Sequence, residues 1–431
     1  MVRMKKILFL FLASLALVPA GAQDSIRDLL RANPDYYCGP YTPYYYLPQS
    51  YTPVPRGFRP FFVNHIARHG SRTYISYKVA DRLLKELAHA REKGCLTTAG
   101  LRLEKDLKYL YDYMDGTWGD LTPLGERQHR EIARRMFRNF PEVFKGKGRR
   151  VDAISTTVPR SMVSMASFMS ELKGLNPNIE MSMQSSDRYR PLLAVSGYSD
   201  HRAHIAQGAY KQPFEQLART KSHDRFIASL FKDGGKCLGT DAADFMYDMF
   251  SVAMIAPDID CPVSLLGYFD EQEKFDQWEL HSLKEYLVKA RSVPAGDVAV
   301  SIIKKLLEQM LVSSQAAIDG TAPYDALFRF AHGENTIPLA AVMELDGLGV
   351  TEADPAEVYK VWQSFNANPM ATNIQWILYR NRKGEVLIKV LYNEREQRLP
   401  SLDQSAAPYY RWDDFKRYYT GVKDRLMDLK Y

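Results

Sequence analysis

The segment Arg68-His69-Gly70-Ser71-Arg72 places a histidine between two arginines, directly after the apolar run 61–67. Guanidinium groups hold phosphate oxygens in pairs and stay charged at any working pH, so two of them beside one imidazole indicate a site for a phosphoryl group. His69 would then be the nucleophile, and a strand-to-helix junction would direct backbone N–H groups at the anion. For so short a motif, the alternative is a basic turn paired with surface carboxylates.

Two further strand-like runs also end in polar side chains. Residues 328–331 lead into His332 and, two residues later, Glu334, before an apolar helix begins. Residues 151–157 lead to Arg160 at the start of another helix-like stretch, although a solvated helix start would explain Arg160 alone. Because open α/β folds bind ligands at the carboxyl edge of the parallel sheet, the three junctions are expected to meet there.

With these motifs the chain resembles the histidine acid phosphatases, and most closely the branch of the multiple inositol polyphosphate phosphatases, which includes phytate-degrading enzymes. Residues 68–72 match the family's Arg-His-Gly-x-Arg signature, and His332-Gly333-Glu334 is similar to the His-Ala-Glu signature of that branch. Residues 119–128 resemble the segment after the first catalytic strand, and the paired runs 374–381 and 386–393 resemble the closing hairpin.

The resemblance implies a phosphomonoester hydrolase that acts in two steps, without a metal or other cofactor. His69 would be phosphorylated, and Glu334 would donate a proton to the leaving alcohol and then act as the base for water. Because the donor must begin protonated beside a phosphate, an acidic to near-neutral optimum is expected. The residues expected to hold the phosphate oxygens are Arg68, Arg72, Arg160 and His332.

The expected substrate is a small anion, an inositol polyphosphate such as phytate. A broad-specificity acid or sugar-phosphate phosphatase would use the same core. A transferase resembling phosphoglycerate mutase and a non-catalytic exported phosphate-ester binder are further alternatives. Retention of both His69 and Glu334 argues against the binder, since binding alone needs no proton donor.

Two positions depart from the family pattern. Tyr74 stands where the family often has proline, and Gly333 stands where the branch has alanine. Neither change removes a charged participant. The loop that aims Glu334 is nevertheless expected to be looser with glycine at 333.

Residues 1–22 have the composition of a secretory signal peptide, with three basic residues, an apolar run and a small-residue cleavage site in that order. A buried N-terminal helix is the alternative. The apolar run is too short for a stable membrane span, and export to the periplasm or the medium is expected. Removing the three basic residues of the signal lowers the formal net charge from +6 to +3, which is not typical of a nucleic-acid-binding protein. The sequence does not indicate an oligomeric state.

Four cysteines remain after the predicted cleavage, and in an oxidising compartment they allow two disulfides in three connectivities. Cys237 and Cys261 are closest in sequence and are the expected bridge. The alternative is that the thiols, with those of Cys38 and Cys95, are free and buried. No Cys-x-x-Cys, His-Glu-x-x-His or Asp-rich calcium loop occurs, so no metal site is predicted.

The predicted fold is α/β, with a mostly parallel central sheet flanked by helices. Residues 23–186 and 323–431 would form the catalytic core, and residues 187–322, which contain few strand-like runs, would form an inserted, mainly helical cap. Basic residues near the start of the insertion would meet outer phosphates or be simply solvated. They are Arg188, Arg190, His201, Arg202 and His204.

Two segments of the predicted core have patterns of their own. Residues 77–93 have apolar side chains at helical spacing and predict an amphipathic helix beside the catalytic strand. Residues 33–56 are rich in tyrosine and proline, which favours an extended segment laid over the surface. An aromatic platform for a ligand is the alternative for that segment.

Overall fold

The computed structural model of the chain describes residues 21–194 and 197–431, so most of the predicted signal peptide, residues 1–22, lies outside the described residues. The described residues form an eight-stranded sheet with the order β3-β2-β4-β1-β5-β6-β7, and β8 pairs with β6. β3, β2, β4 and β1 are parallel, whereas β5 and the strands beyond it are antiparallel to their neighbours. The strands are β1 Arg59–Arg68, β2 Arg150–Ser155, β3 Glu180–Ser185, β4 Ala326–Ala331, β5 Asn373–Arg380, β6 Val386–Tyr392, β7 Arg395–Glu396 and β8 Tyr410–Arg411.

The central strands β1 and β4 are buried on both faces, which is typical of parallel strands covered by helices on either side. Arg68, the last residue of β1, pairs with Ala331, the last residue of β4. The residues that follow, His69 and His332, therefore leave the sheet at the same edge. β2 pairs with the other side of β4 and ends at the same level, with Ser155 opposite Phe330. The predicted α/β fold with a mostly parallel sheet is confirmed.

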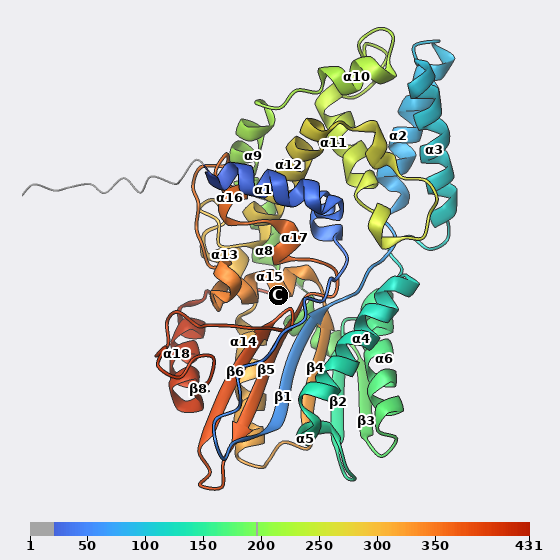
Figure 1. Ribbon diagram of the computed structural model, residues 1–431. Helices are drawn as coiled ribbons and strands as arrows, with labels where there is room; N and C mark the ends of the chain where they lie inside the picture. Colours follow the sequence, from blue (N-terminus) through green and yellow to red (C-terminus); the bar gives the residue numbers. More distant parts are fainter. Residues whose placement is uncertain (1–20, 195–196) are drawn as a thin grey trace, which may run out of the picture.

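Helices cover both faces of the sheet (Figure 1). Val63 and Ala67 of β1 belong to the apolar cluster on one face, and Phe62 and Ile66 belong to the cluster on the other. This alternation follows from the two-residue period of a strand. The first face carries α4 Pro123–Asn139, α5 Pro141–Phe144 and α6 Pro159–Leu175; the second carries α14 Lys304–Ile318, α15 Gly333–Val342 and α18 Trp412–Arg425.

A third apolar cluster lies beyond the carboxyl edge of the parallel strands and forms the core of a helical cap (Figure 1). Among its members Trp278 is fully buried. Helices from before and within the predicted insertion, residues 187–322, share this cluster. They are α1 Gly21–Ala32, α2 Tyr77–Glu92, α3 Thr98–Met114, α10 Asp224–Leu230, α11 Ala242–Ala253, α12 Glu271–Lys289 and the 3₁₀ helix η1 Pro34–Tyr41.

The helix predicted for residues 77–93 is confirmed as α2, but its position differs from the prediction. Its buried side chains, such as Leu83 and Leu87, pack with α3 and α11 in the cap rather than beside β1. The chain leaves the sheet layer before the helix begins, because Tyr74 is already buried in the cap cluster. The helical period therefore predicted the element correctly but not the layer in which it packs.

The remaining helices connect the cap and the sheet layer. α12 is one continuous helix, whereas residues 296–318 form two helices that are separated at Ile302 and Ile303. Among the described residues, no helix combines the length and apolarity that crossing a membrane requires. The α-helices not named above are short: α7 Arg190–Leu193, α8 Ser199–Gln207, α9 Lys211–Ala218, α13 Gly296–Ser301, α16 Val358–Val361 and α17 Ser364–Ala367.

The predicted disulfide between Cys237 and Cys261 is wrong: Cys237 pairs with Cys95, and Cys261 and Cys38 are free. The bonded cysteines are 142 residues apart in sequence, but the loop after α2 lies beside the end of α10. There, Leu96 forms a β-bridge with Phe231. Distance along the chain was therefore a poor guide, because the cap is built from segments far apart in sequence.

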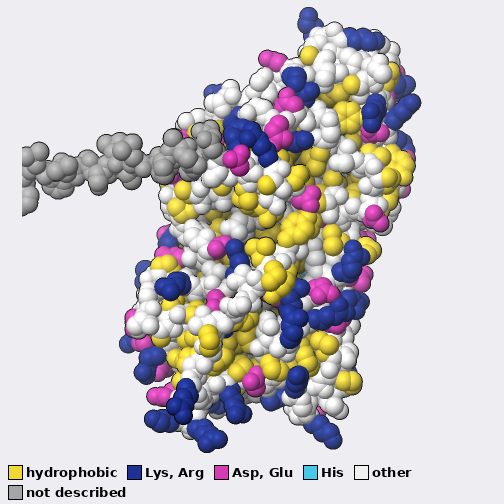
Figure 2. Space-filling model, in the orientation of Figure 1, with side chains coloured by type: hydrophobic (Ala, Val, Ile, Leu, Met, Phe, Trp, Pro, Cys, Tyr) yellow, Lys and Arg dark blue, Asp and Glu magenta, His cyan; other side chains and the backbone are white. Residues whose placement is uncertain are grey.

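Charged side chains of both signs occur on the face shown in Figure 2. On the face shown in Figure 2, Lys and Arg are interspersed with Asp and Glu over both the sheet layer and the cap. This distribution agrees with the small net charge of the chain.

Candidate active site

His69 follows β1 directly, and its ring is oriented by the backbone. The His69 N–H donates to the carbonyl oxygen of Ala331 (N···O 3.0 Å). Nδ1 of the ring lies 2.9 Å from the carbonyl oxygen of Gly70, which can only accept, so Nδ1 carries the proton and Nε2 the lone pair. Burial, reinforced by Arg68 and Arg72, lowers the pKa of His69 well below its usual value. The imidazole is therefore neutral.

The two arginines of the same segment are oriented by carbonyl oxygens. Nη1 of Arg68 donates to the carbonyls of Pro40 (2.7 Å) and Asn368. Nη1 of Arg72 donates to the carbonyl of Thr73 (2.8 Å). Carbonyl oxygens carry no full charge, so they fix the guanidinium groups without neutralising them.

His332 lies at the end of β4, as the N-cap residue of α15. Its ring centroid is 5.6 Å from that of His69, and its Nε2 lies 3.2 Å from Oγ1 of Thr156. Burial lowers the pKa of His332 to about 4, even though Glu334 favours the charged form. The two predicted site histidines are thus brought together at the carboxyl edge of the sheet.

Arg160 completes a group of three arginines. It is the second residue of α6, which begins where β2 has ended. Burial, and next Arg72, lowers its pKa to about 10, so it remains charged. The Nε groups of Arg68, Arg72 and Arg160 are all buried, and within the described part of the chain none of them has a hydrogen-bond partner. Three cations with unused donors therefore surround the place where a phosphoryl group would meet His69.

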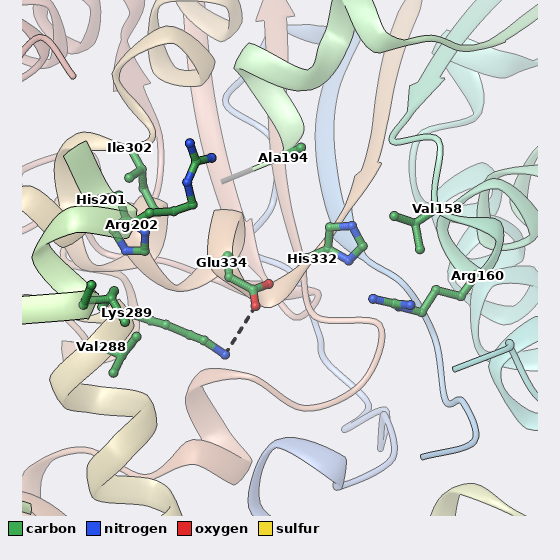
Figure 3. A pocket seen from close by; sticks show the side chains of 12 residues that line it. Val158, Arg160, Ala194, His201, Arg202, Val288, Lys289, Ile302, His332 and Glu334 are labelled. Atoms are coloured by element: carbon green, nitrogen blue, oxygen red, sulfur yellow. Dashed lines mark ion pairs between the residues drawn. The ribbon is translucent and has the colours of Figure 1, made fainter. Parts of the chain in front are cut away.

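Glu334 lies in the first turn of α15 and faces a lysine that the sequence did not predict (Figure 3). Nζ of Lys289, at the end of α12, is 3.6 Å from Oε1 of Glu334. The Glu334 side chain is 42% exposed, toward the cavity. Burial raises its pKa, but Lys289, then His332 and Arg68, outweigh burial, and the net pKa is well below the usual value. Glu334 is therefore a carboxylate in the empty site.

Part of this group lines a cavity of about 580 Å³ between the sheet layer and the cap (Figure 3). Arg160, His332 and Glu334 line it from the sheet side. Lys289 lines it from the cap side with His201 and Arg202, and apolar side chains such as Val288 and Ile302 form the rest of the wall. The volume is in the usual range for small-molecule sites.

Of the basic residues predicted to meet outer phosphates, His201 and Arg202 line this cavity and the others do not. Arg188 donates to Gln184, and Arg190 lies 3.8 Å from Asp187. His204, on the same helix as His201, is also absent from the cavity wall.

Gly333 is tightly packed, contrary to the expectation of a looser loop. A Cβ atom built at Gly333 would lie 2.4 Å from Nδ2 and 2.6 Å from Oδ1 of Asn368. Asn368 is almost fully buried, so its side chain has little room to move away. The amide of Asn368 thus occupies the space that an alanine methyl group would need.

The aromatic segment 33–56 contributes to the arginine group, which the sequence did not predict. η1 buries Pro40, whose carbonyl holds Arg68, and the ring of Tyr41 lies 4.9 Å from the guanidinium carbon of Arg72. Tyr74, where the family often has proline, stacks on Tyr41 with ring centroids 6.1 Å apart. The departure at position 74 is therefore accommodated by a contact that supports Tyr41.

All six predicted site residues lie at one edge of the sheet, and the residues missed are those that hold them. The backbone carbonyl of Asn368 holds Arg68, the ring of Tyr41 lies against Arg72, and the charge of Lys289 pairs with Glu334. None of these three contacting residues belongs to a recognisable motif. The only local signal for Lys289 was Glu285 four residues earlier on a helix, a spacing that commonly forms solvated pairs.

Known proteins share this architecture. Multiple inositol polyphosphate phosphatase 1 of Gallus gallus is 20% identical over 399 residues, which cover 86% of this chain and 83% of that protein. The crystal structure of the Bifidobacterium longum multiple inositol polyphosphate phosphatase in complex with inositol hexasulfate has a TM-score of 0.79 and 19% identity, covering 89% of this chain and 97% of that chain. The phytase of D. castellii has a TM-score of 0.66 and 14% identity, covering 94% and 90%. At these identities the solved structures establish a common fold.

The family itself follows from the sequence match. The model described as histidine phosphatase superfamily (branch 2) matches residues 61–393, a span that contains both histidines, the three arginines and Glu334. The chain belongs to branch 2 of the histidine phosphatase superfamily.

Proposed function

We propose that this protein hydrolyses the phosphate monoesters of inositol polyphosphates such as phytate, through a phosphohistidine intermediate. The observation that carries the proposal is the neutral His69 imidazole, with its Nε2 lone pair free, among arginines whose Nε groups are unused. Phosphate monoesters repel anionic nucleophiles, so a neutral imidazole surrounded by fixed positive charge is a suitable attacker.

In the first step, Nε2 of His69 bonds to phosphorus while the bond from phosphorus to the ester oxygen breaks. The arginines and His332 hold the phosphoryl oxygens, and Glu334 gives a proton to the departing alcohol oxygen. The Nδ1 proton of His69 remains hydrogen-bonded to the Gly70 carbonyl, which keeps the ring aligned.

In the second step, water attacks the phosphorus of phosphohistidine. Glu334, now a carboxylate, takes the proton from water, the N–P bond breaks, and inorganic phosphate and neutral His69 are released. Glu334 must be protonated for the first step, although the cations around it lower its pKa. The negative charge of bound phosphate raises the pKa of a nearby carboxyl group. An acidic to near-neutral optimum follows.

The choice of inositol polyphosphates is supported by the cavity and by the relatives. Cations line the cavity from both layers, with Arg160 on the sheet side and Lys289 and Arg202 on the cap side, so an anion with several phosphates would be contacted beyond the reacting one. The Bifidobacterium longum and Gallus gallus relatives are named for inositol polyphosphates.

The test is phosphate release by the purified protein from phytate, glucose 1-phosphate and p-nitrophenyl phosphate, compared as kcat/KM. We expect phytate to be preferred. A preference for glucose 1-phosphate or equal use of all three would favour a sugar-phosphate or broad acid phosphatase, and no release from any of them would refute the hydrolase.

We also propose that the protein is exported. The support is the signal-like composition of residues 1–22 together with the Cys95–Cys237 disulfide, because disulfides persist mainly outside the cytosol. Fractionation of the producing cells, with sequencing of the mature N-terminus, tests this: a cytosolic protein that begins at Met1 would contradict it.

A further inference from the structure

We propose that Lys289 is a positioning residue for the proton donor: its ammonium group, anchored by Glu285, holds the Glu334 carboxyl group at the cavity and sets the pH range in which Glu334 exchanges its proton. The inference rests on the proposed function, because it takes Glu334 as the acid and base of the reaction. Lys289 would not act on the phosphorus or the leaving group itself.

The geometry gives Lys289 one near and one farther partner. Its Nζ lies 2.7 and 2.9 Å from the two carboxylate oxygens of Glu285, one turn earlier on α12, and 3.6 Å from Oε1 of Glu334 (Figure 3). The Lys289 side chain is 19% exposed and that of Glu285 18% exposed. Glu285 therefore fixes the ammonium group, and the fixed ammonium acts on Glu334 across the cavity.

The anchor is itself connected to the arginine side of the site. Oε2 of Glu285 lies 3.5 Å from Nδ2 of Asn368, and the Asn368 carbonyl accepts a hydrogen bond from Arg68. A row of polar contacts thus runs from Glu334 through Lys289, Glu285 and Asn368 to the phosphate-binding arginines. The cap helix α12 is thus connected both to Glu334 and, through Asn368, to Arg68.

Charges from several elements face Glu334, and Lys289 is the nearest cation. Within the described chain, Lys289 alone forms an ion pair with the Glu334 carboxylate. The other groups act from farther away, and since Coulomb interactions weaken with distance, Lys289 has the largest charge effect. The other charged or titratable groups around Glu334 are His332 at the junction of β4 and α15, Arg68 at the end of β1, Arg160 on α6, His201 on α8 and Glu285 on α12.

Removing the ammonium group should change the pH profile in a defined direction. A nearby cation favours the ionised carboxyl group, so its loss raises the pKa of Glu334. The acid form needed for the first step would then persist to higher pH, and the base form needed for the second step would appear only at higher pH. Both limbs of the activity profile should move upward, by ~1 unit or more for an opposite charge at this distance.

The experiment compares the parent with Lys289→Met and Lys289→Arg. For each protein, kcat and kcat/KM are measured from pH 3 to 9 with 2-glycerophosphate, whose alkoxide needs a proton to leave, and with p-nitrophenyl phosphate, whose leaving group does not. For kcat/KM, which reports the first step, we expect the profile of Lys289→Met to move upward on 2-glycerophosphate and much less on the nitrophenyl ester. For kcat, the limb that the second step sets should move upward with both esters, because both form the same phosphohistidine. Lys289→Arg should keep the parent profile. Using one substrate for all variants cancels the titration of the substrate.

Two further variants serve as controls. Lys85→Met removes an exposed lysine that also pairs with an acid four residues away, Asp81. Neither residue lines the cavity, so the variant should leave the profile unchanged. The double variant Glu285→Gln with Lys289→Met removes the Glu285 carboxylate that the single variant leaves without its lysine. It can therefore replace Lys289→Met in the test if the single variant does not fold. Its profile should also move upward, by less than that of Lys289→Met, because the repulsion from Glu285 is absent.

The outcomes are separable. If Lys289→Met and the double variant lose activity equally at all pH values, with both limbs in place, Lys289 binds phosphate or supports the fold, and the inference is overturned. If the parent forms no phosphohistidine from any ester, the proposed function and this inference fall together. A parent that does form it, with limbs that do not move in the variants, overturns this inference alone.

Discussion

His69 and the arginines beside it are held by backbone carbonyls, whereas the Glu334 carboxylate is paired with a side-chain charge from the cap, that of Lys289. The attacking side is buried and its groups have fixed charge states: a neutral imidazole and cationic guanidiniums. The donor side is open to the cavity, and in the proposed mechanism its carboxyl group gains and loses a proton in every cycle.

This difference suits the two tasks. A nucleophile gains from exact alignment and a constant protonation state, and carbonyl oxygens provide both without changing charge. A proton donor needs a pKa that responds to the substrate, and a carboxyl group that is open to the cavity meets the negative charge of a bound phosphate, which raises its pKa. We therefore expect substitutions on the attacking side to remove activity, and those on the donor side to slow it or shift its pH dependence.

The largest expected effect is that of His69→Ala, which should abolish turnover because the proposed mechanism has no other nucleophile. Binding of phosphate esters should persist, since the arginines remain. Acid quench with labelled substrate should trap phosphohistidine in the parent and none in the variant. Phosphate found on serine or aspartate instead would contradict the assignment of the attacking side.

Glu334→Gln should slow phytate hydrolysis by roughly 10²- to 10⁴-fold, the usual range for a positioned acid. The first step with p-nitrophenyl phosphate should suffer less, because nitrophenolate leaves without a proton. Rapid mixing should then show a burst of nitrophenol followed by a stall as phosphorylated His69. Equal slowing of the first step for both esters, with no accumulated phosphoenzyme, would mean that the acid lies elsewhere.

Gly333→Ala should reduce kcat by about 10- to 100-fold, because the new methyl group displaces Asn368 and misaligns the groups on either side of it. Asn368→Ala keeps the backbone carbonyl that holds Arg68 and serves as the control. Combining the two substitutions should recover most of the activity lost by Gly333→Ala alone. No recovery would show that position 333 acts independently of Asn368.

The smallest effect is on stability, from a fully buried carboxyl group behind the arginines. Burial raises the pKa of Asp258 to about 8, although Arg72 and Arg68 lower it. In the unfolded chain its pKa would be near 4, so its contribution to stability is complete below pH 4 and is lost as the pH rises to about 8. Asp258→Asn should therefore raise the melting temperature by a few degrees at pH 7.5, and by less at pH 4.5. A gain that is the same at both pH values would show that Asp258 does not titrate in this range.

The sequence was sufficient for the parts of the fold and site that are locally encoded. An apolar run that ends in a charged or imidazole side chain identified β1, β2 and β4, and the rule that ligands bind at the carboxyl edge placed His69, His332 and Arg160 together. The α/β fold followed in the same way, whereas the hairpin of β5 and β6 was indicated by the resemblance to the family.

The parts that depend on long-range packing were not predictable. The helical period of α2 is the same whether it packs on the sheet or in the cap, and Cys95 has no sequence feature that singles out Cys237. Lys289 and Glu285 have the spacing of an ordinary surface pair. Their role appears only when α12 is placed over α15.

The contact between Gly333 and Asn368 has a consequence for the evolution of the family. A methyl group at 333 and an amide at 368 compete for one volume, so the two positions should covary among homologues. Chains with alanine at the first position should carry a smaller or differently oriented side chain at the second. An alignment of branch members would then divide into two groups at these columns, and single exchanges between the groups would be disfavoured unless both positions changed together.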